Sequence, residues 1–239
     1  MEEIFDVKPR DIVSKVIIAP FDKAKAKLEA DGFSLVSLSP NAQLRIQEGK
    51  DAYVSKNGNW TREGIVYIPN DNPKLVRISP ILESAKKATK AHRHGKEFYP
   101  TKTQIEKAVD SESFELPRKN FTIPTNRFGE ESLTVFAFEG EDNARKYGEF
   151  LKKVGINKMP IWLVGSNYVN KQEKPFVRQL WFNNFGGRSE LLGGNDRDLY
   201  YSSRVRGMLE TSEKLAHEKL VYIQNKFNTS IRSFWINWN

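Results

Sequence analysis

The side chains that could do chemistry fall into short clusters. His92 and His94 flank an arginine, and carboxylates gather at 139–142 and at 196–198. Histidine and carboxylate bind zinc, and paired acids hold catalytic magnesium, so these clusters are candidates for a metal site or a nuclease. The chain has no cysteine, which excludes thiol nucleophiles, iron–sulfur clusters and most structural zinc sites.

None of these clusters has the pattern that a catalytic or metal site requires. The paired histidines stand two residues apart at a predicted helix end, where they point to different faces, and the third histidine is distant, at His217. Glu141 and Asp142 begin a predicted helix, where acids are expected in any case. No glycine-rich phosphate loop followed by Lys-Ser/Thr occurs. We therefore expect a protein that is not an enzyme, with no metal and no cofactor.

The predicted elements are those of an α+β protein with mixed short strands. Apolar alternation and turn residues predict strands at 11–18, 33–38, 52–55, 64–68, 75–78, 133–138, 159–164 and 177–182. Helical periodicity predicts helices at 21–30, 80–92, 101–109 and 142–154, with the middle two as the main helices. Thr101 is the candidate N-cap of its helix. The polar stretch 111–129 is predicted to be a loop.

The chain is basic. It carries 38 Lys and Arg against 30 Asp and Glu in 239 residues, a formal charge of +8. Such an excess attracts polyanions, so a nucleic-acid-binding protein, possibly a metal-dependent nuclease, is one hypothesis, and a lysine-rich solvated surface is the simpler interpretation. No apolar run reaches the length of a membrane span, and the start lacks the pattern of a signal peptide. We expect a cytoplasmic or virion-associated protein.

The segment from Pro175 to Glu213 contains no lysine, although lysine is common elsewhere. It is crowded with Asn, Gly, Asp, Ser and Tyr, which antibody loops favour because Tyr gives contact area at low entropic cost and the others give adaptable hydrogen bonds. An ordinary long polar loop is the simpler interpretation.

Residues 179–208, called the variable segment below, resemble the variable proteins of diversity-generating retroelements, particularly those of archaea and their viruses. The resemblance rests on Gln179-Leu180-Trp181-Phe182, Ser189-x-Leu191-x-Gly193, Arg197-x-Leu199 and Val205-Arg206-Gly207-Met208. In that family an error-prone reverse transcriptase rewrites adenines, so AAC codons become Asn, Ser, Gly, Asp, Tyr, Phe, Leu or Arg but never Lys. The missing lysine fits this chemistry. Glu190 does not fit an AAC origin, so it is either a fixed position or evidence against the resemblance.

The resemblance implies a C-type-lectin-like fold, of the type also seen in formylglycine-generating enzyme, with a long irregular C-terminal variable segment. Tyr99-Pro100-Thr101 resembles the start of the second helix of that fold. The implied organisation is a lead at 1–30, the lectin-like domain at 31–209 and a helical tail at 210–239 with an aromatic end. The chain lacks both the cysteines of formylglycine chemistry and the Glu-Pro-Asn or Gln-Pro-Asp tripeptide of calcium-dependent sugar binding, so neither activity is expected.

The resemblance also divides the variable segment into two groups. The frame residues would be buried or hold tight backbone geometry, and they are Trp181, Leu191, Gly193, Leu199, Val205, Arg206 and Gly207. The display positions, within 182–204, would point outward and bind a protein or surface ligand, and they are Asn183, Asn184, Phe185, Gly187, Arg188, Glu190, Leu192, Asn195, Asp196, Asp198, Tyr200, Tyr201, Ser202 and Ser203. We therefore expect a ligand-binding display protein whose ligand the sequence does not name.

Overall fold

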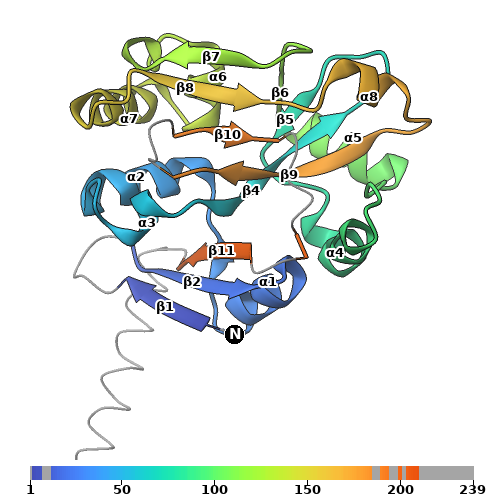
Figure 1. The fold of residues 1–239 in the computed structure, drawn as a ribbon, viewed down its shortest axis with the longest axis horizontal. Helices are drawn as coiled ribbons and strands as arrows, with labels where there is room; N and C mark the ends of the chain where they lie inside the picture. The colour runs from blue at the N-terminus through green and yellow to red at the C-terminus, as the bar shows by residue number, and fades with distance from the viewer. Residues whose placement is uncertain (1, 7–11, 185–188, 194–198, 201–202, 210–239) are drawn as a thin grey trace, which may run out of the picture. The chain divides into compact units, whose positions relative to one another are not determined.

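The computed structural model describes residues 2–6, 12–184, 189–193, 199–200 and 203–209 (Figure 1). The chain divides into two compact units, Met1–Met208 and Leu209–Asn239. Every element below lies in the first unit. The predicted helical tail at 210–239 and its aromatic end lie outside the described residues.

A single mixed sheet organises the first unit. Its path among the described residues is β1-β2-β11-β4-β9-β10-β8-β7, and β3, β5 and β6 pair off this path. The strands are β1 Glu2–Asp6, β2 Ser14–Ala19, β3 Ser34–Leu35, β4 Asn59–Tyr67, β5 Lys74–Val76, β6 Ser113–Glu115, β7 Phe121–Pro124, β8 Lys158–Trp162, β9 Phe176–Phe182, β10 Leu191–Leu192 and β11 Ser203–Met208. Both β10 and β11 belong to the variable segment, and both lie between other strands rather than at an edge (Figure 1).

Helices surround the sheet. They are α1 Phe21–Ala30, α2 Leu38–Glu48, α3 Tyr53–Lys56, α4 Ala85–Arg93, α5 Lys102–Ser111, α6 Ser132–Ala137, α7 Glu141–Lys153 and α8 Ser166–Asn170, with 3-10 turns η1 Leu82–Ser84 and η2 Thr125–Arg127. Helices α1, α2, α4, α5 and α7 are the longest, with nine to thirteen residues each. None of the helices in the described part of the chain is long and apolar enough to cross a membrane.

Two hydrophobic clusters form the core, and the alternation of β9 shows how the sheet separates them. Phe176, Leu180 and Phe182 belong to the first cluster, to which α2, α6 and α7 contribute. Val177 and Trp181 belong to the second cluster, to which α1, α4 and α5 contribute. Because successive residues of a strand point to opposite faces, each cluster covers one face of the sheet.

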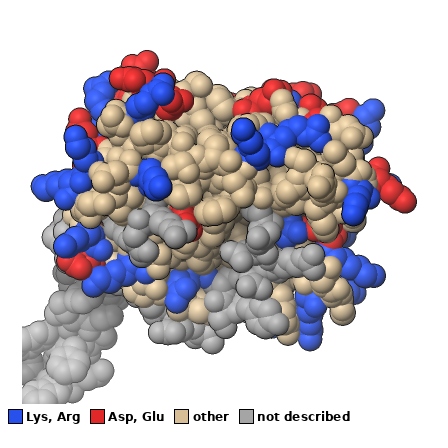
Figure 2. Space-filling model, turned by 45° about the horizontal axis from the view of Figure 1, so that its top comes forward, with Lys and Arg blue, Asp and Glu red and all other residues tan. Residues whose placement is uncertain are grey.

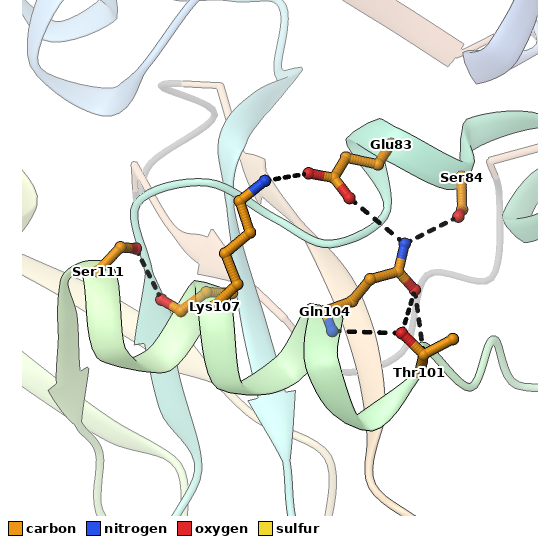
Figure 3. Close-up of polar contacts among 7 residues, drawn as sticks. Glu83, Ser84, Thr101, Gln104, Lys107 and Ser111 are labelled. Atoms are coloured by element: carbon orange, nitrogen blue, oxygen red, sulfur yellow. Dashed lines mark hydrogen bonds and ion pairs between the residues drawn. The ribbon is translucent and has the colours of Figure 1, made fainter.

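Several predicted elements are confirmed, among them the helices at 21–30 and 142–154 and the N-cap at Thr101. The Thr101 hydroxyl accepts a hydrogen bond from Gln104 N at 3.2 Å, and Gln104 Oε1 accepts one from Thr101 N at 3.0 Å (Figure 3). This reciprocal pairing satisfies backbone donors that the first turn of a helix leaves open. Lys107 then joins α5 to η1 through an ion pair with Glu83 at 2.8 Å (Figure 3).

Other predicted elements are wrong. The strand expected at 52–55 is the short helix α3, and the strand expected at 133–138 is α6. In α6 the Thr134 hydroxyl donates to Glu131 O at 2.8 Å and to Phe128 O, which satisfies carbonyl groups just before the helix. The loop expected at 111–129 contains β6, β7 and η2, and the strand expected at 33–38 pairs only at 34–35 before α2 begins.

The boundary expected at residue 30 does not separate two units. Strand β2 pairs antiparallel with β11 along six residues of each, from Ser14↔Met208 to Ala19↔Ser203. Helix α1 packs against β11 and α4. Residues of the predicted lead are therefore part of the same sheet and core as the variable segment.

Candidate functional site

The variable segment turns from β9 into β10 through a closed hairpin. Asn183 N donates a hydrogen bond to Glu190 O at 2.9 Å, and Ser189 N donates one to Asn184 O at 3.3 Å. β10 then pairs antiparallel with β9 and parallel with β8. The hairpin therefore brings both ends of loop 185–188, which lies outside the described residues, to the rim of the sheet.

Glu190 does not occupy the place expected of a display position. Its side chain is buried, at 9% exposed, and its carboxylate accepts a hydrogen bond from Asn183 Nδ2 at 3.0 Å. Leaving a buried carboxylate without such a partner destabilises the folded state. The hydrogen bond between Asn183 and Glu190 therefore stabilises the base of the hairpin. Glu190 is therefore buried where an outward-pointing side chain was expected.

A buried polar chain anchors the start of β10. Ser189 adopts the left-handed conformation, with φ of 46°, and its hydroxyl lies 2.8 Å from the Tyr147 hydroxyl on α7. Arg45 on α2 donates to Tyr147 Oη and to Phe182 O, both at 3.2 Å. Burial raises the pKa of Tyr147 and lowers the pKa of Arg45. The phenol therefore stays neutral at physiological pH and can donate to Ser189 while it accepts from Arg45.

Gly193, at the end of β10, contacts three residues that lie outside the variable segment. Its carbonyl accepts a hydrogen bond from Tyr67 Oη at 2.9 Å, and its N–H donates to Trp162 O at 2.9 Å. A Cβ at Gly193 would meet the Ile65 side chain and would lie 3.2 Å from Tyr67 Oη. A larger residue here would have to displace the Ile65 side chain, so the packing favours glycine.

Leu199 and Val205 bury their side chains in the second cluster, both at 0% exposed. Leu199 also fixes the chain through its backbone, since its carbonyl accepts a hydrogen bond from Phe21 N at 2.8 Å. Leu199 lies before β11 and Val205 lies within it, so both bury side chains where the variable segment returns to the sheet.

Arg206 and Gly207 fit β11 against the N-terminal elements. Arg206 is 1% exposed, its Nη1 donates to Ser14 Oγ at 2.7 Å, and its carbonyl accepts from Val36 N at 3.0 Å. A Cβ at Gly207 would lie 2.9 Å from Leu28 Cδ2. Arg206 therefore forms an internal polar link to β2, and Gly207 allows β11 to pack closely against the Leu28 side chain.

Trp181 is only partly buried, unlike the other frame residues. Its ring packs edge-on against Trp60 at a centroid distance of 4.9 Å, and its Nε1 donates to Asn183 Oδ1 at 3.3 Å. Gly58 lies directly against the ring, because a Cβ there would come within 2.5 Å of Trp181 Nε1. One face of the indole is thus packed while the side chain remains accessible.

An accessible apolar row crosses the sheet beside the hairpin. Leu192 on β10 pairs with Trp162 on β8 and with Trp181 on β9, so the three side chains lie on one face. Leu192 is partly buried and Trp162 is 39% exposed. Sequence reasoning missed Trp162, because nothing distinguishes one tryptophan in a predicted strand until its neighbours are known. Figure 2 shows a face on which uncharged side chains gather between charged groups at the rim.

The other described display positions are accessible to different extents. Asn184 is partly buried and donates from Nδ2 to Lys56 O at 3.1 Å. Tyr200 is partly buried beneath Arg93, whose guanidinium lies 4.7 Å from the ring centroid. Ser203 begins β11. Eight predicted display positions lie outside the described residues, and they are Phe185, Gly187, Arg188, Asn195, Asp196, Asp198, Tyr201 and Ser202.

Comparison with known proteins adds one finding. No protein-family model matches the chain, and no curated protein matches it in sequence. A solved structure from Nanoarchaeota, described as the accommodation of massive sequence variation by the C-type lectin fold, aligns with a TM-score of 0.60 at 14% identity, over 85% of this chain and 99% of that one. The chain has a C-type lectin fold. The predicted fold class is therefore confirmed.

Two of the clusters with catalytic or metal-binding residue types lie among the described residues of this C-type lectin fold, and Asp196 and Asp198 lie outside them. His92 is buried and His94 is exposed at the end of α4. Glu139 lies 3.8 Å from a guanidinium nitrogen of Arg77, and Asp142 stands in the first turn of α7. No group of three or more His, Asp or Glu side chains that could hold a metal forms among the described residues.

Proposed function

We propose that this protein is a ligand-binding display protein and not an enzyme. In this proposal the C-type lectin fold holds the variable segment as a binding surface for a protein or surface ligand. Exposed positions of the segment determine which ligand is bound, and buried positions keep the surface in place.

The observation that carries the proposal is the origin of the contacts that hold the segment. Gly193 is bonded to β4, Ser189 to α7, and Arg206 to β2, so each support comes from outside the variable segment. A surface supported in this way can change its exposed side chains without changing its supports. Surface substitutions usually alter the free energy of unfolding by only about 0.5 kcal/mol, so such change is cheap.

The accessible apolar row supplies the affinity that a variable polar surface needs. Trp162 lies outside the variable segment and would stay while Leu192 beside it changes. Tryptophan is enriched among the residues that dominate binding energy at interfaces. We infer that ligands of this protein share an apolar group that packs on Trp162.

We further propose that a diversity-generating retroelement varies the display positions, because the segment contains no lysine and is rich in AAC-derived residue types. The test lies beside the gene. A near-repeat of the coding segment for 179–208, differing mainly at adenines and adjacent to a reverse transcriptase gene, is the expected finding. A gene neighbourhood without such a repeat would overturn this part of the proposal.

Selection from two libraries tests the binding function itself. The first library randomises the display positions Asn184, Leu192, Asn195, Asp196, Tyr200 and Tyr201, and the second randomises the frame residues Leu191, Leu199 and Val205. Both are displayed on yeast and sorted against the same unrelated soluble proteins. We expect specific binders from the first library and loss of surface expression in the second. Display-position variants that fail to express as often as frame variants would overturn the proposal.

A further inference from the structure

A cationic pocket lies between α1 and α4, next to a display position. Helices α1 and α4 pack side by side (Figure 1), and Tyr200 completes the pocket, which has a volume of about 270 Å³. Lys23 comes from α1, and Lys86, Lys90 and Arg93 come from α4. One carboxylate, that of Asp22, faces these four permanent cations.

Three of the four cations have no acidic partner in the described part of the chain. Lys23, Lys86 and Lys90 make no ion pair with any residue that the structure describes, whereas Lys25 on α1 and Lys107 on α5 reach Glu29 and Glu83 at 2.6 and 2.8 Å. Like charges that converge in a concave site repel one another and raise the local potential for an anion. Asp22 is the one carboxylate among the lining residues, so the pocket carries a net positive charge.

Helix electrostatics do not explain this arrangement. Lys90 and Arg93 stand in the last turn of α4, where cations are favourable, but Lys86 is the second residue of α4 and Lys23 the third residue of α1. A cation in the first turn faces the positive end of the helix dipole, which is unfavourable. Two of the four cations are therefore placed against the local field.

A buried donor also lines the pocket. Thr89 is 5% exposed, and its hydroxyl has no hydrogen-bond partner among the described residues. Buried hydroxyls normally have a partner, so this one is open to a hydrogen bond with a bound group. Asp22 Oδ1 in the same pocket is likewise buried without a partner among the described residues, so a bound group with both acceptor atoms and a donor hydroxyl would satisfy both. A tetrahedral oxyanion provides several acceptor atoms for such a set of donors.

We propose that this pocket binds a phosphate or sulfate group of the ligand. The volume is slightly below the range of about 300–1,000 Å³ for small-molecule sites, so it fits an end group rather than a whole ligand. Because the cations lie outside the variable segment, they would form a fixed anion subsite beside the changing Tyr200. The role as a fixed subsite beside a changing residue rests on the proposed display function, while the anion site itself does not.

The test is an NMR titration of the whole chain with glucose 6-phosphate, glucose 6-sulfate and glucose at low salt. We expect the two charged sugars, or one of them, to shift amide signals around Thr89 and Arg93, and glucose to leave them unchanged. Binding of the phosphorylated sugar without the sulfated one, or the reverse, identifies which of the two groups the pocket recognises. Equal shifts with glucose, or none with either charged sugar, would overturn the proposal.

Variants on α4 provide the matched control. Lys86→Gln and Lys90→Gln should each weaken binding roughly threefold, as expected for the loss of one exposed charge contact. Lys87→Gln changes the same net charge on the same helix but does not line the pocket, and it should leave affinity unchanged. Thr89→Val, which removes the unpartnered hydroxyl, should also weaken binding. Equal weakening by Lys87→Gln, or tight binding of short duplex DNA alone, would mean general attraction to polyanions and would overturn the site.

The outcome separates this inference from the display proposal. Tyr200→Ser and Tyr200→Asn, both from the residue types that AAC codons yield, should retain binding of the charged sugar to within about threefold. If selected binders arise but no charged sugar binds, the anion site is wrong and the display function stands. If the charged sugar binds but no library yields binders, the anion site stands and the display function is wrong.

Discussion

The Tyr67 hydroxyl on β4 donates a 2.9 Å hydrogen bond to the carbonyl oxygen of Gly193, and it accepts one from Val164 N at 3.2 Å. One buried phenol thus joins the central strand, the chain that follows β8 and the end of β10. The burial that raises the pKa of Tyr67 also keeps this hydroxyl neutral and available as a donor.

Tyr67→Phe should lower the free energy of unfolding by about 1–3 kcal/mol, because it leaves a buried carbonyl and a buried N–H without their partner. Urea unfolding followed by far-UV circular dichroism measures the change. Tyr53→Phe is the control, since the Tyr53 hydroxyl makes no hydrogen bond with the described residues. Equal effects of the two substitutions would show that the Gly193 bond does not support β10.

The side-chain contact between Asn183 and Glu190 should appear as coupling in a double-mutant cycle. Asn183→Ala and Glu190→Ala are each expected to destabilise, with a coupling of about 0.5–1.5 kcal/mol in the double variant. Asn183→Ala combined with Glu115→Ala should be additive, because Glu115 is on β6, which pairs with neither β9 nor β10. Additive effects in the first cycle would show that the two side chains do not stabilise each other, which would contradict a supporting role for Glu190.

Gly207→Ala should destabilise by about 1–3 kcal/mol, because the added methyl group meets the packed Leu28 and Phe33 side chains. Gly165→Ala is the matched control. It has an ordinary φ of −61° and nothing within 4 Å of the added Cβ, so its effect should be near zero. Thermal unfolding of the two variants compares them directly. A Gly207→Ala variant as stable as the parent would contradict the close approach of β11 and α1.

Burial raises the pKa of Glu63 from 4.5 to about 7, and its carboxylate accepts a hydrogen bond from Leu38 N at 3.0 Å. Between these two pKa values the folded state holds a proton that the unfolded state has lost, so stability falls as pH rises. Ionised Glu63 should cost about 3 kcal/mol above pH 7. In urea unfolding at several pH values, Glu63→Gln should remove this fall and the exposed Glu149→Gln should retain it. A fall of the same size in both variants would assign the pH dependence to other groups.

The sequence predicts best the features that depend on local chemistry. Thr101 was predictable as an N-cap because Ser and Thr satisfy the open donors of a first turn wherever they stand. The strand expected at 133–138 is a helix, because a short apolar run suits a strand and a buried helix equally well and periodicity alone cannot separate them. Trp162 and Tyr67 were not predictable, since their roles come from strand pairing with distant parts of the chain.

Within the described part of the variable segment, residue type alone does not decide which side chains are buried. Glu190 and Ser189 are polar and belong to the supports. Leu192 is apolar and belongs to the accessible face. Polarity indicates exposure only on average, because a polar group inside the fold is stable when its hydrogen bonds are made.

The central claim is that the variable segment consists of a fixed support and an interchangeable surface. Saturation mutagenesis of 179–208, read out as unfolding free energy by proteolysis of each variant, tests it most directly. We expect most substitutions at Ser189, Glu190, Leu191, Gly193, Leu199, Val205, Arg206 and Gly207 to cost more than about 1 kcal/mol. Substitutions at Asn184, Leu192, Tyr200 and Ser203 should stay within about 0.5 kcal/mol of the parent. Costs that do not separate into these two groups would contradict the account.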